Sequence, residues 1–225
     1  MSTPPLSFAE MPTGRLLMAD EPAQVTRDLL LNDPSLEPAA LKVFARVTRP
    51  GYTAGVVAAF NVNKTAACVT GSLHADDAEL PAEATQFGVT VYKAGDRSVR
   101  VITRGAHSML PFELDETGFE LFTLVPTRGG VSVFGLLDKY LGPAAVVSVR
   151  QEGRGVTVVR LREAGDFGAG LVSPPASIEV DGRRLPPSAY TYARGLLQVP
   201  RASFGARAGE REVKIVMPSV RNRAR

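Results

Sequence analysis

Glycine and proline recur so often along this chain that its apolar segments are short. The 225 residues include 21 glycines and 17 prolines, above the usual share of roughly 12% for these two residue types together. Glycine favours turns, and proline blocks both helix interiors and central strands. The sequence therefore favours many short strands over long helices, and all-β domains of about 200–250 residues occur as single units.

Alternation of side chains marks the first expected strand. Residues 41–48 place Leu41, Val43, Ala45 and Val47 on one face and the intervening residues on the other, as the two-residue period of a strand requires. This segment therefore predicts a strand with one apolar face.

Later segments predict further strands. Residues 55–62 form a mostly apolar run, typical of a strand covered on both faces. Gly95 and Asp96 lie between residues 89–93 and 98–103, which predicts a hairpin. We expect the remaining strands at 107–114, 118–126, 144–150, 155–162, 167–172, 176–180, 195–199 and 211–217.

Many strands joined by short turns predict an all-β fold. We expect an antiparallel β-sandwich of the jelly-roll or Greek-key type, with an irregular N-terminal arm. The expected divisions are a proline-rich arm over residues 1–40, the sandwich over 41–217 and a basic tail over 218–225. One helical turn is expected at 136–140. A (β/α)₈ barrel needs about 250 residues and helices that alternate with strands, and the sequence has no such alternation.

Charge and hydropathy disfavour nucleic acid and membranes as partners. The net charge is +3, and Arg221, Arg223 and Arg225 account for much of the excess, without the basic stripe of a nucleic-acid interface. No apolar run approaches the about 18 residues of a membrane span. The N-terminal residues do not show a basic flank followed by an apolar run. We therefore also expect no signal peptide and a cytoplasmic protein.

Cys68 is the only cysteine, so no disulfide can form within the chain. Its neighbours Ala66, Ala67 and Val69 are small and apolar. These neighbours predict a buried, unreactive thiol.

No pattern in the sequence predicts catalysis, a cofactor or a metal. His74 and His107 have no partner at metal-ligand spacing, and the glycine-rich residues 165–170 precede a strand rather than the helix that a phosphate site needs. A Gly-x-Ser-x-Gly motif is absent. Three carboxylate pairs have the composition of a glycosidase site, but the first two lie in turn-like sequence and the third lies on one side of an expected strand that ends in a turn. The pairs are Asp76 with Asp77, Asp115 with Glu116, and Glu179 with Asp181.

Two tyrosines form a candidate sugar platform. Tyr190 and Tyr192 share one face of an expected strand, and an aromatic ring matches the apolar C–H face of a sugar. The alternative is that both rings cover the edge of the sandwich, since tyrosine suits a site with one end buried and one end wet.

Several segments, in order, resemble one family, the raffinose synthases and related alkaline α-galactosidases (seed imbibition proteins). The segments are AQVTRDLLLNDP (23–34), LKVF (41–44), GVVAAFN (55–61), FELFTLVP (119–126), FGLLDKY (134–140) and GDFGA (165–169). Together they cover roughly residues 15–217. The loop that follows the third segment in the family is replaced by residues 62–65.

The resemblance implies a sandwich without catalytic residues. Family members have a central (β/α)₈ barrel that carries both catalytic aspartates, whereas the matched segments belong to the C-terminal β-sandwich and its entry arm. The resemblance therefore implies a stand-alone subunit or truncated copy linked to α-galactoside metabolism in the cytoplasm, without a cofactor. A free-standing carbohydrate-binding module is the alternative. A catalytic barrel protein, a second copy of the chain and α-galactoside sugars are the partners to consider.

The arm supplies a candidate interface. Thr26, Arg27, Asp28, Leu29 and Leu30 belong to a short apolar stretch between prolines, too brief to form a core of its own. This stretch must pack on its own sandwich, meet another copy or bind a partner. The side chains of the adjacent Arg27 and Asp28 cannot face each other on a strand, so we expect each to pair elsewhere.

Overall fold

A computed structural model describes residues 8–10, 16–29, 32–105 and 108–218. It is mostly β structure, arranged in several antiparallel sheets, with one short α-helix, α1 (Ala82–Thr85), in the described residues. The prediction of a predominantly antiparallel β fold is confirmed. No helix within these ranges is long and apolar enough to cross a membrane.

The largest sheet has six strands in the order β3-β4-β5-β10-β7-β8. Its longest pairing joins β4 to β5 across their full length, with Leu41 opposite Phe60 and Arg49 opposite Tyr52. The strands are β3 (Gln24–Val25), β4 (Leu41–Arg49), β5 (Tyr52–Phe60), β7 (Val89–Lys93), β8 (Ser98–Ile102) and β10 (Phe119–Val125). The β7–β8 hairpin confirms the turn expected at Gly95.

Two further sheets come from the C-terminal half. One has the order β11-β14-β18-β17 and the other the order β12-β13-β19-β15-β16. Their strands are β11 (Val131–Leu136), β12 (Val146–Gln151), β13 (Val156–Leu161), β14 (Phe167–Leu171), β15 (Ser177–Val180), β16 (Arg183–Arg184), β17 (Thr191–Ala193), β18 (Leu196–Val199) and β19 (Arg211–Val216). Short 3₁₀ turns lie at Arg27–Leu29, Gly142–Ala145, Pro187–Ala189 and Arg201–Phe204.

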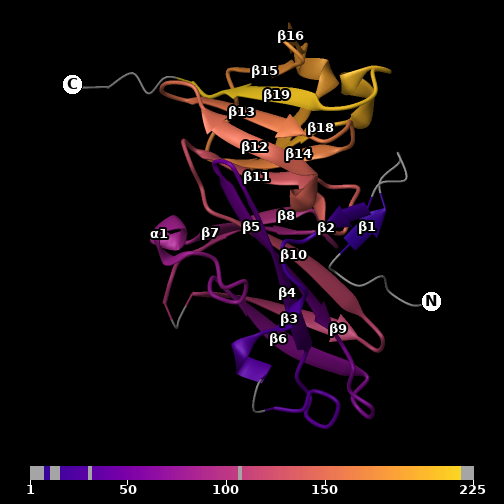
Figure 1. Cartoon of the computed structure of the whole chain (residues 1–225). Helices are drawn as coiled ribbons and strands as arrows, with labels where there is room; N and C mark the ends of the chain where they lie inside the picture. The colour runs from indigo at the N-terminus through magenta and orange to yellow at the C-terminus, as the bar shows by residue number, and fades with distance from the viewer. Residues whose placement is uncertain (1–7, 11–15, 30–31, 106–107, 219–225) are drawn as a thin grey trace.

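Two two-stranded sheets complete the described chain. They are β1 (Phe8–Glu10) with β2 (Leu16–Met18), and β6 (Cys68–His74) with β9 (Met109–Asp115). Figure 1 shows the sheets in layers: the five-stranded sheet at the top, then the four-stranded sheet, the six-stranded sheet and, at the bottom, β6 with β9.

The six-stranded sheet is covered on both faces. In β5, Val56 and Ala58 belong to a core shared with the C-terminal sheets, whereas Val57 and Ala59 belong to a second core shared with β6 and β9. Successive residues of a strand point to opposite faces, so the apolar run in β5 serves both cores. The expectation of a doubly covered strand is confirmed, because nearly every β5 residue is buried.

Specific contacts join the six-stranded sheet to the four-stranded sheet. Tyr92 of β7 stacks on Phe134 of β11 with ring centroids 5.3 Å apart. Tyr52 donates a hydrogen bond from its hydroxyl to the Val133 carbonyl at 2.9 Å. The Ser132 and Thr90 hydroxyls bond at 3.0 Å. These contacts hold β11 against the six-stranded sheet.

Some local predictions were wrong. The segment 136–140 forms a turn rather than a helical turn, and the α-helix lies at residues 82–85. The reason is the backbone at Gly135, where a φ of +87° turns the chain back toward Gly142. The approach is so close that a Cβ at Gly135 would lie 2.2 Å from the Gly142 carbonyl oxygen. Strands β6 and β11 were not predicted. The expected tail lies outside the described residues from residue 219 onward.

Candidate functional site

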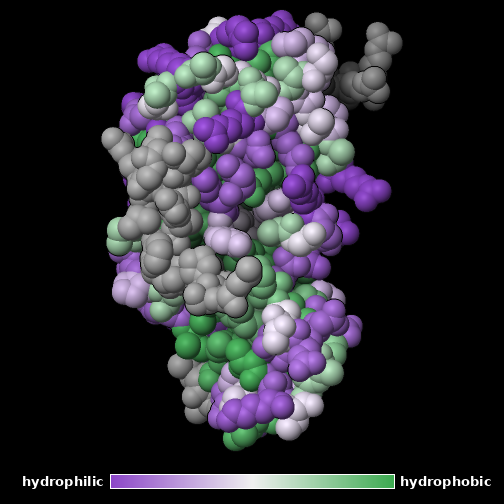
Figure 2. All heavy atoms as spheres, turned by 90° about the vertical axis from the view of Figure 1, so that its right-hand side faces the viewer, coloured by the Kyte–Doolittle hydropathy of each residue, from purple (hydrophilic) through white to green (hydrophobic). Residues whose placement is uncertain are grey.

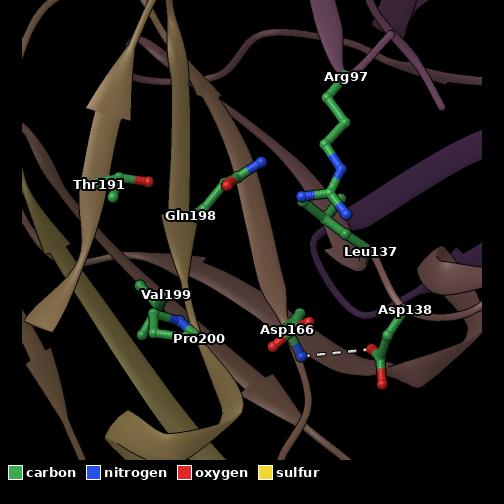
Figure 3. Close-up of a pocket in the computed structure, with 8 residues that line it drawn as sticks. All are labelled: Arg97, Leu137, Asp138, Asp166, Thr191, Gln198, Val199 and Pro200. Carbon is green, nitrogen blue, oxygen red and sulfur yellow. Dashed lines mark hydrogen bonds between the residues drawn. The ribbon is translucent and has the colours of Figure 1, made fainter. Parts of the chain in front are cut away.

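Two adjoining hollows open where the β7–β8 turn approaches the turn after β11. The central hollow has a volume of about 290 Å³ and the aromatic hollow a volume of about 380 Å³. They share Leu137 and Asp138, and together we call them the groove. Figure 3 shows the central hollow, with side chains contributed by the β7–β8 turn, the turn after β11, and β14, β17 and β18 or the residues next to them.

The groove is built by two segments that are distant in the sequence, FGLLDKY and GDFGA. The Leu137 amide donates to the Asp166 carbonyl at 2.6 Å, and the Asp166 amide donates to Asp138 Oδ1 at 3.3 Å. Close approach requires glycine in the second segment, because a Cβ at Gly168 would lie 2.5 Å from Leu137 Cδ2. The two segments therefore hold each other in place.

The two carboxylates of the central hollow both accept backbone hydrogen bonds. Asp138 accepts the Asp166 amide, and Asp166 Oδ1 accepts the Arg201 amide at 2.9 Å. Lys139 Nζ lies 3.9 Å from Asp138 Oδ2. These bonds fix the orientation of both carboxylates and leave acceptor capacity on each, since a carboxylate has about four lone-pair sites.

Three other polar side chains of the central hollow have unused hydrogen-bonding groups. Arg97, Thr191 and Gln198 make no side-chain hydrogen bond or ion pair within the described part of the chain. In Figure 3, Arg97 reaches into the hollow from one side, and Gln198 and Thr191 lie across from it. The hollow therefore presents a guanidinium, an amide and a hydroxyl together.

The aromatic hollow carries two exposed rings. Tyr140 is 48% exposed and Phe119 47% exposed, and both line this hollow. Phe119 stacks on Phe60 with centroids 6.2 Å apart. Glu120 is held by the Gly95 amide, which donates to its Oε1 at 2.8 Å. Rings beside fixed acceptors suit a ligand with both apolar and hydroxyl faces.

The described residues of the candidate interface contact the chain's own sheet. Thr26 is buried and its hydroxyl donates to the Lys42 carbonyl at 3.4 Å, and Leu29 is also buried. Arg27 pairs with Glu79 at 2.6 Å, and Asp28 pairs with Lys42 at 2.9 Å.

The expectation that Arg27 and Asp28 pair elsewhere is confirmed. Leu30 lies outside the described residues. Two upstream carboxylates also pair with β4: Asp20 with Arg49, and Glu21 with Arg46.

We predict that acidification weakens this attachment through Asp28. Burial alone would raise the pKa of Asp28, but hydrogen bonds from Thr26 and Lys42 and the Lys42 charge lower it below 3.8. A lowered pKa stabilises the fold above about pH 4, and this contribution is lost as the pH falls through the folded-state pKa. Urea unfolding at pH 6 and pH 3 should show a larger loss of stability for wild type than for Asp28→Asn. Equal losses would contradict the prediction.

The candidate sugar platform does not line the groove. Tyr190 and Tyr192 are half-buried and pack against the core, and the Tyr192 hydroxyl donates to the Leu171 carbonyl at 3.4 Å. Alternation along β17 explains their placement: Thr191 lines the groove, so its neighbour Tyr192 points to the other face.

The carboxylate pairs singled out in the sequence are partly used in ion pairs. Asp76 pairs with Arg104, Asp77 with Lys42, and Asp181 with Arg211.

One histidine lies beside a hydroxyl. His74 Nε2 lies 3.1 Å from Ser72 Oγ, but Asp77 bonds the His74 backbone amide rather than its ring. The pair therefore has no carboxylate orienting the imidazole, and neither side chain lines the groove. His107 lies outside the described residues. No group of three or more His, Cys, Asp or Glu side chains suited to a metal occurs in the described ranges.

The expectation of a buried thiol was wrong. Cys68 is exposed, and its Sγ lies 2.8 Å from Glu113 Oε1. It begins β6, where alternation turns Val69 into the core and Cys68 outward. The hydrogen bond to Glu113 raises the pKa of the thiol, which keeps it in its less reactive protonated form.

No model of a known protein family matches this chain, and a search of curated proteins finds no similar one. The groove must therefore be interpreted from its own geometry. Sequence reasoning missed Arg97, Gln198 and Thr191, which carry no motif. The available signal was the pair of segments FGLLDKY and GDFGA, which were noted in the sequence and which meet here.

Proposed function

We propose that this chain is a non-catalytic antiparallel β-sandwich similar to the C-terminal domain of raffinose synthase and alkaline α-galactosidase-type enzymes. It acts in cytoplasmic α-galactoside metabolism as a stand-alone subunit or truncated copy. The observation that carries the proposal is the meeting of FGLLDKY and GDFGA at one groove, through the Leu137–Asp166 and Asp166–Asp138 bonds. Segments that resemble a family in sequence and also contact one another support a shared architecture.

The stacked sheets support the sandwich assignment within this proposal. The four- and five-stranded sheets contribute Phe167, Leu197, Ile178 and Val213 to one core, as facing sheets of a sandwich do.

An exposed apolar surface supports a protein partner. Figure 2 shows the side of the molecule that is on the right in Figure 1, where hydrophobic residues gather in the lower part, at the height of β3 and β9. Contiguous apolar patches on soluble proteins commonly mark interaction sites. The partner we propose is a catalytic barrel protein, with self-association as the alternative.

Enzyme assays test the non-catalytic role. The purified chain should not turn over an aryl α-galactoside above the rate of a buffer blank, because the segments that resemble the family lie outside the barrel that carries its two catalytic aspartates. Turnover that a single Asp or Glu substitution abolishes would overturn the proposal.

Association gives the positive half of the test. A barrel protein encoded beside this chain should co-elute with it in size-exclusion chromatography. Unchanged elution of both proteins, at concentrations well above micromolar, would count against the subunit role.

A free-standing carbohydrate-binding module is the second candidate. The groove favours it, because Tyr140 and Phe119 are exposed beside fixed acceptors, whereas Tyr190 and Tyr192 are half-buried.

A further inference from the structure

We propose that the groove binds a neutral oligosaccharide, with one sugar ring in the central hollow and the next in the aromatic hollow. The inference deepens the proposed function, and it relies on that function only for the choice of an α-galactoside as the first probe. The polar side chains of the central hollow and the exposed rings of the aromatic hollow carry it.

The mixed charges of these two hollows disfavour strongly ionic ligands. In the central hollow the Arg97 guanidinium faces two carboxylates, Asp138 and Asp166. In the aromatic hollow Lys139 Nζ lies 3.9 Å from Asp138, and Glu120 lies 3.6 Å from Lys93 Nζ. An anion would meet the carboxylates, and a cation would meet Arg97 or Lys139. A neutral ligand with many hydroxyls meets donors and acceptors on every side, since each hydroxyl both donates and accepts.

The unused hydrogen-bonding groups define the central subsite. Arg97 offers donors, Gln198 offers both a donor and an acceptor, and the oriented carboxylates of Asp138 and Asp166 offer acceptors. Both carboxylates are already aligned by backbone amides. A pre-oriented acceptor loses little side-chain freedom on binding. The arrangement therefore favours adjacent sugar hydroxyls that bridge a carboxylate and the guanidinium.

The exposed rings define the second subsite. Tyr140 and Phe119 line the aromatic hollow and each is about half exposed. Their faces match the apolar C–H face of a pyranose, and the fixed Glu120 carboxylate accepts from its hydroxyls.

The size of the hollows fits a short oligosaccharide. Their volumes of about 290 and 380 Å³ lie near the lower end of the roughly 300–1,000 Å³ found for small-ligand sites. Each hollow suits one ring, and Leu137 and Asp138 lie where the two rings would be linked.

The test is titration of the full chain with raffinose and, separately, with maltotriose, followed by calorimetry and by amide chemical shifts. Saturable binding with shifts at residues 95–97, 137–140 and 198 is expected. Arg97→Ala should weaken binding about 10-fold or more, as loss of a hydrogen bond from a charged group does. Tyr140→Ala should also weaken it.

Matched controls separate the groove from other sites. Arg154→Ala removes another exposed arginine from a hairpin turn outside the groove and should leave binding unchanged. Unfolding midpoints of all variants verify that they fold. Binding that survives Arg97→Ala and Tyr140→Ala but is lost in Tyr190→Ala would overturn the groove in favour of the tyrosine platform.

The choice of sugar distinguishes this inference from the proposed function. Groove-dependent binding of maltotriose but not raffinose supports the groove as a sugar site and counts against the link to α-galactosides. Absence of binding to either sugar at about 10 mM, a concentration that would nearly saturate a site with a Kd of about 1 mM, overturns the groove. The non-catalytic role is then left to its own assays.

Discussion

Replacing Lys42 with methionine is expected to lower the free energy of unfolding by about 3–5 kcal/mol, the usual cost of removing one partner from a buried ion pair. The Lys42 side chain is only 3% exposed, although it carries a charge. Its Nζ lies 2.8 Å from Asp77 Oδ2 and 2.9 Å from both Asp28 Oδ2 and the Ser72 carbonyl. Without it, the Asp77 carboxylate, itself 10% exposed, keeps only the His74 backbone amide as a donor among the described residues.

Urea unfolding at pH 7 measures this effect. Lys214→Met is the matched control, because Lys214 also lies in a strand but is 33% exposed and pairs with Glu152 at 3.4 Å. Exposed pairs contribute roughly 0–1 kcal/mol. The double variant Lys42→Met with Asp77→Asn should lose less free energy of unfolding than the sum of the losses in the two single variants. A loss below about 1 kcal/mol for Lys42→Met would contradict the role assigned to the pair.

Phe134→Ala is expected to cost about 3–5 kcal/mol, the range for removing a phenylalanine from a packed core. Phe134 is 1% exposed and stacks on Tyr92 across two sheets. The packing around it is close, since a Cβ at Gly170 would lie 3.0 Å from Phe134 Cζ. Removing the ring therefore leaves a cavity between β7, β11 and β14.

The same denaturation experiment tests this prediction. Phe87→Ala is the control, because Phe87 is 83% exposed and exposed substitutions usually change stability by at most about 0.5 kcal/mol. Similar losses for the two variants would show that the contact between the sheets contributes little. Phe134 is the first residue of FGLLDKY, so the amide shifts of Leu137 and Asp138 should also change in Phe134→Ala.

Prediction from the sequence failed at two strands, β6 and β11. The β11 segment VSVFGL is buried along its whole length, so it lacks the alternation that marks a strand with one wet face. The β6 segment CVTGSLH contains polar and small residues and reads as a turn-rich stretch, yet pairing with β9 makes it a strand. Both strands depend on partners that local sequence does not identify.

The sequence by itself determined the class of secondary structure and the faces of individual strands. Alternation in β4 turned Val43, Ala45 and Val47 toward one core, and the Gly95–Asp96 turn predicted the hairpin, because side-chain period and turn chemistry are local properties. Only the tertiary structure decided which strands are neighbours and where a site forms. Asp166 and Gln198 come together through the pairing of β14 with β18, and Arg97 joins them from the β7–β8 turn of another sheet. Such contacts depend on the packing of whole sheets rather than on any short motif.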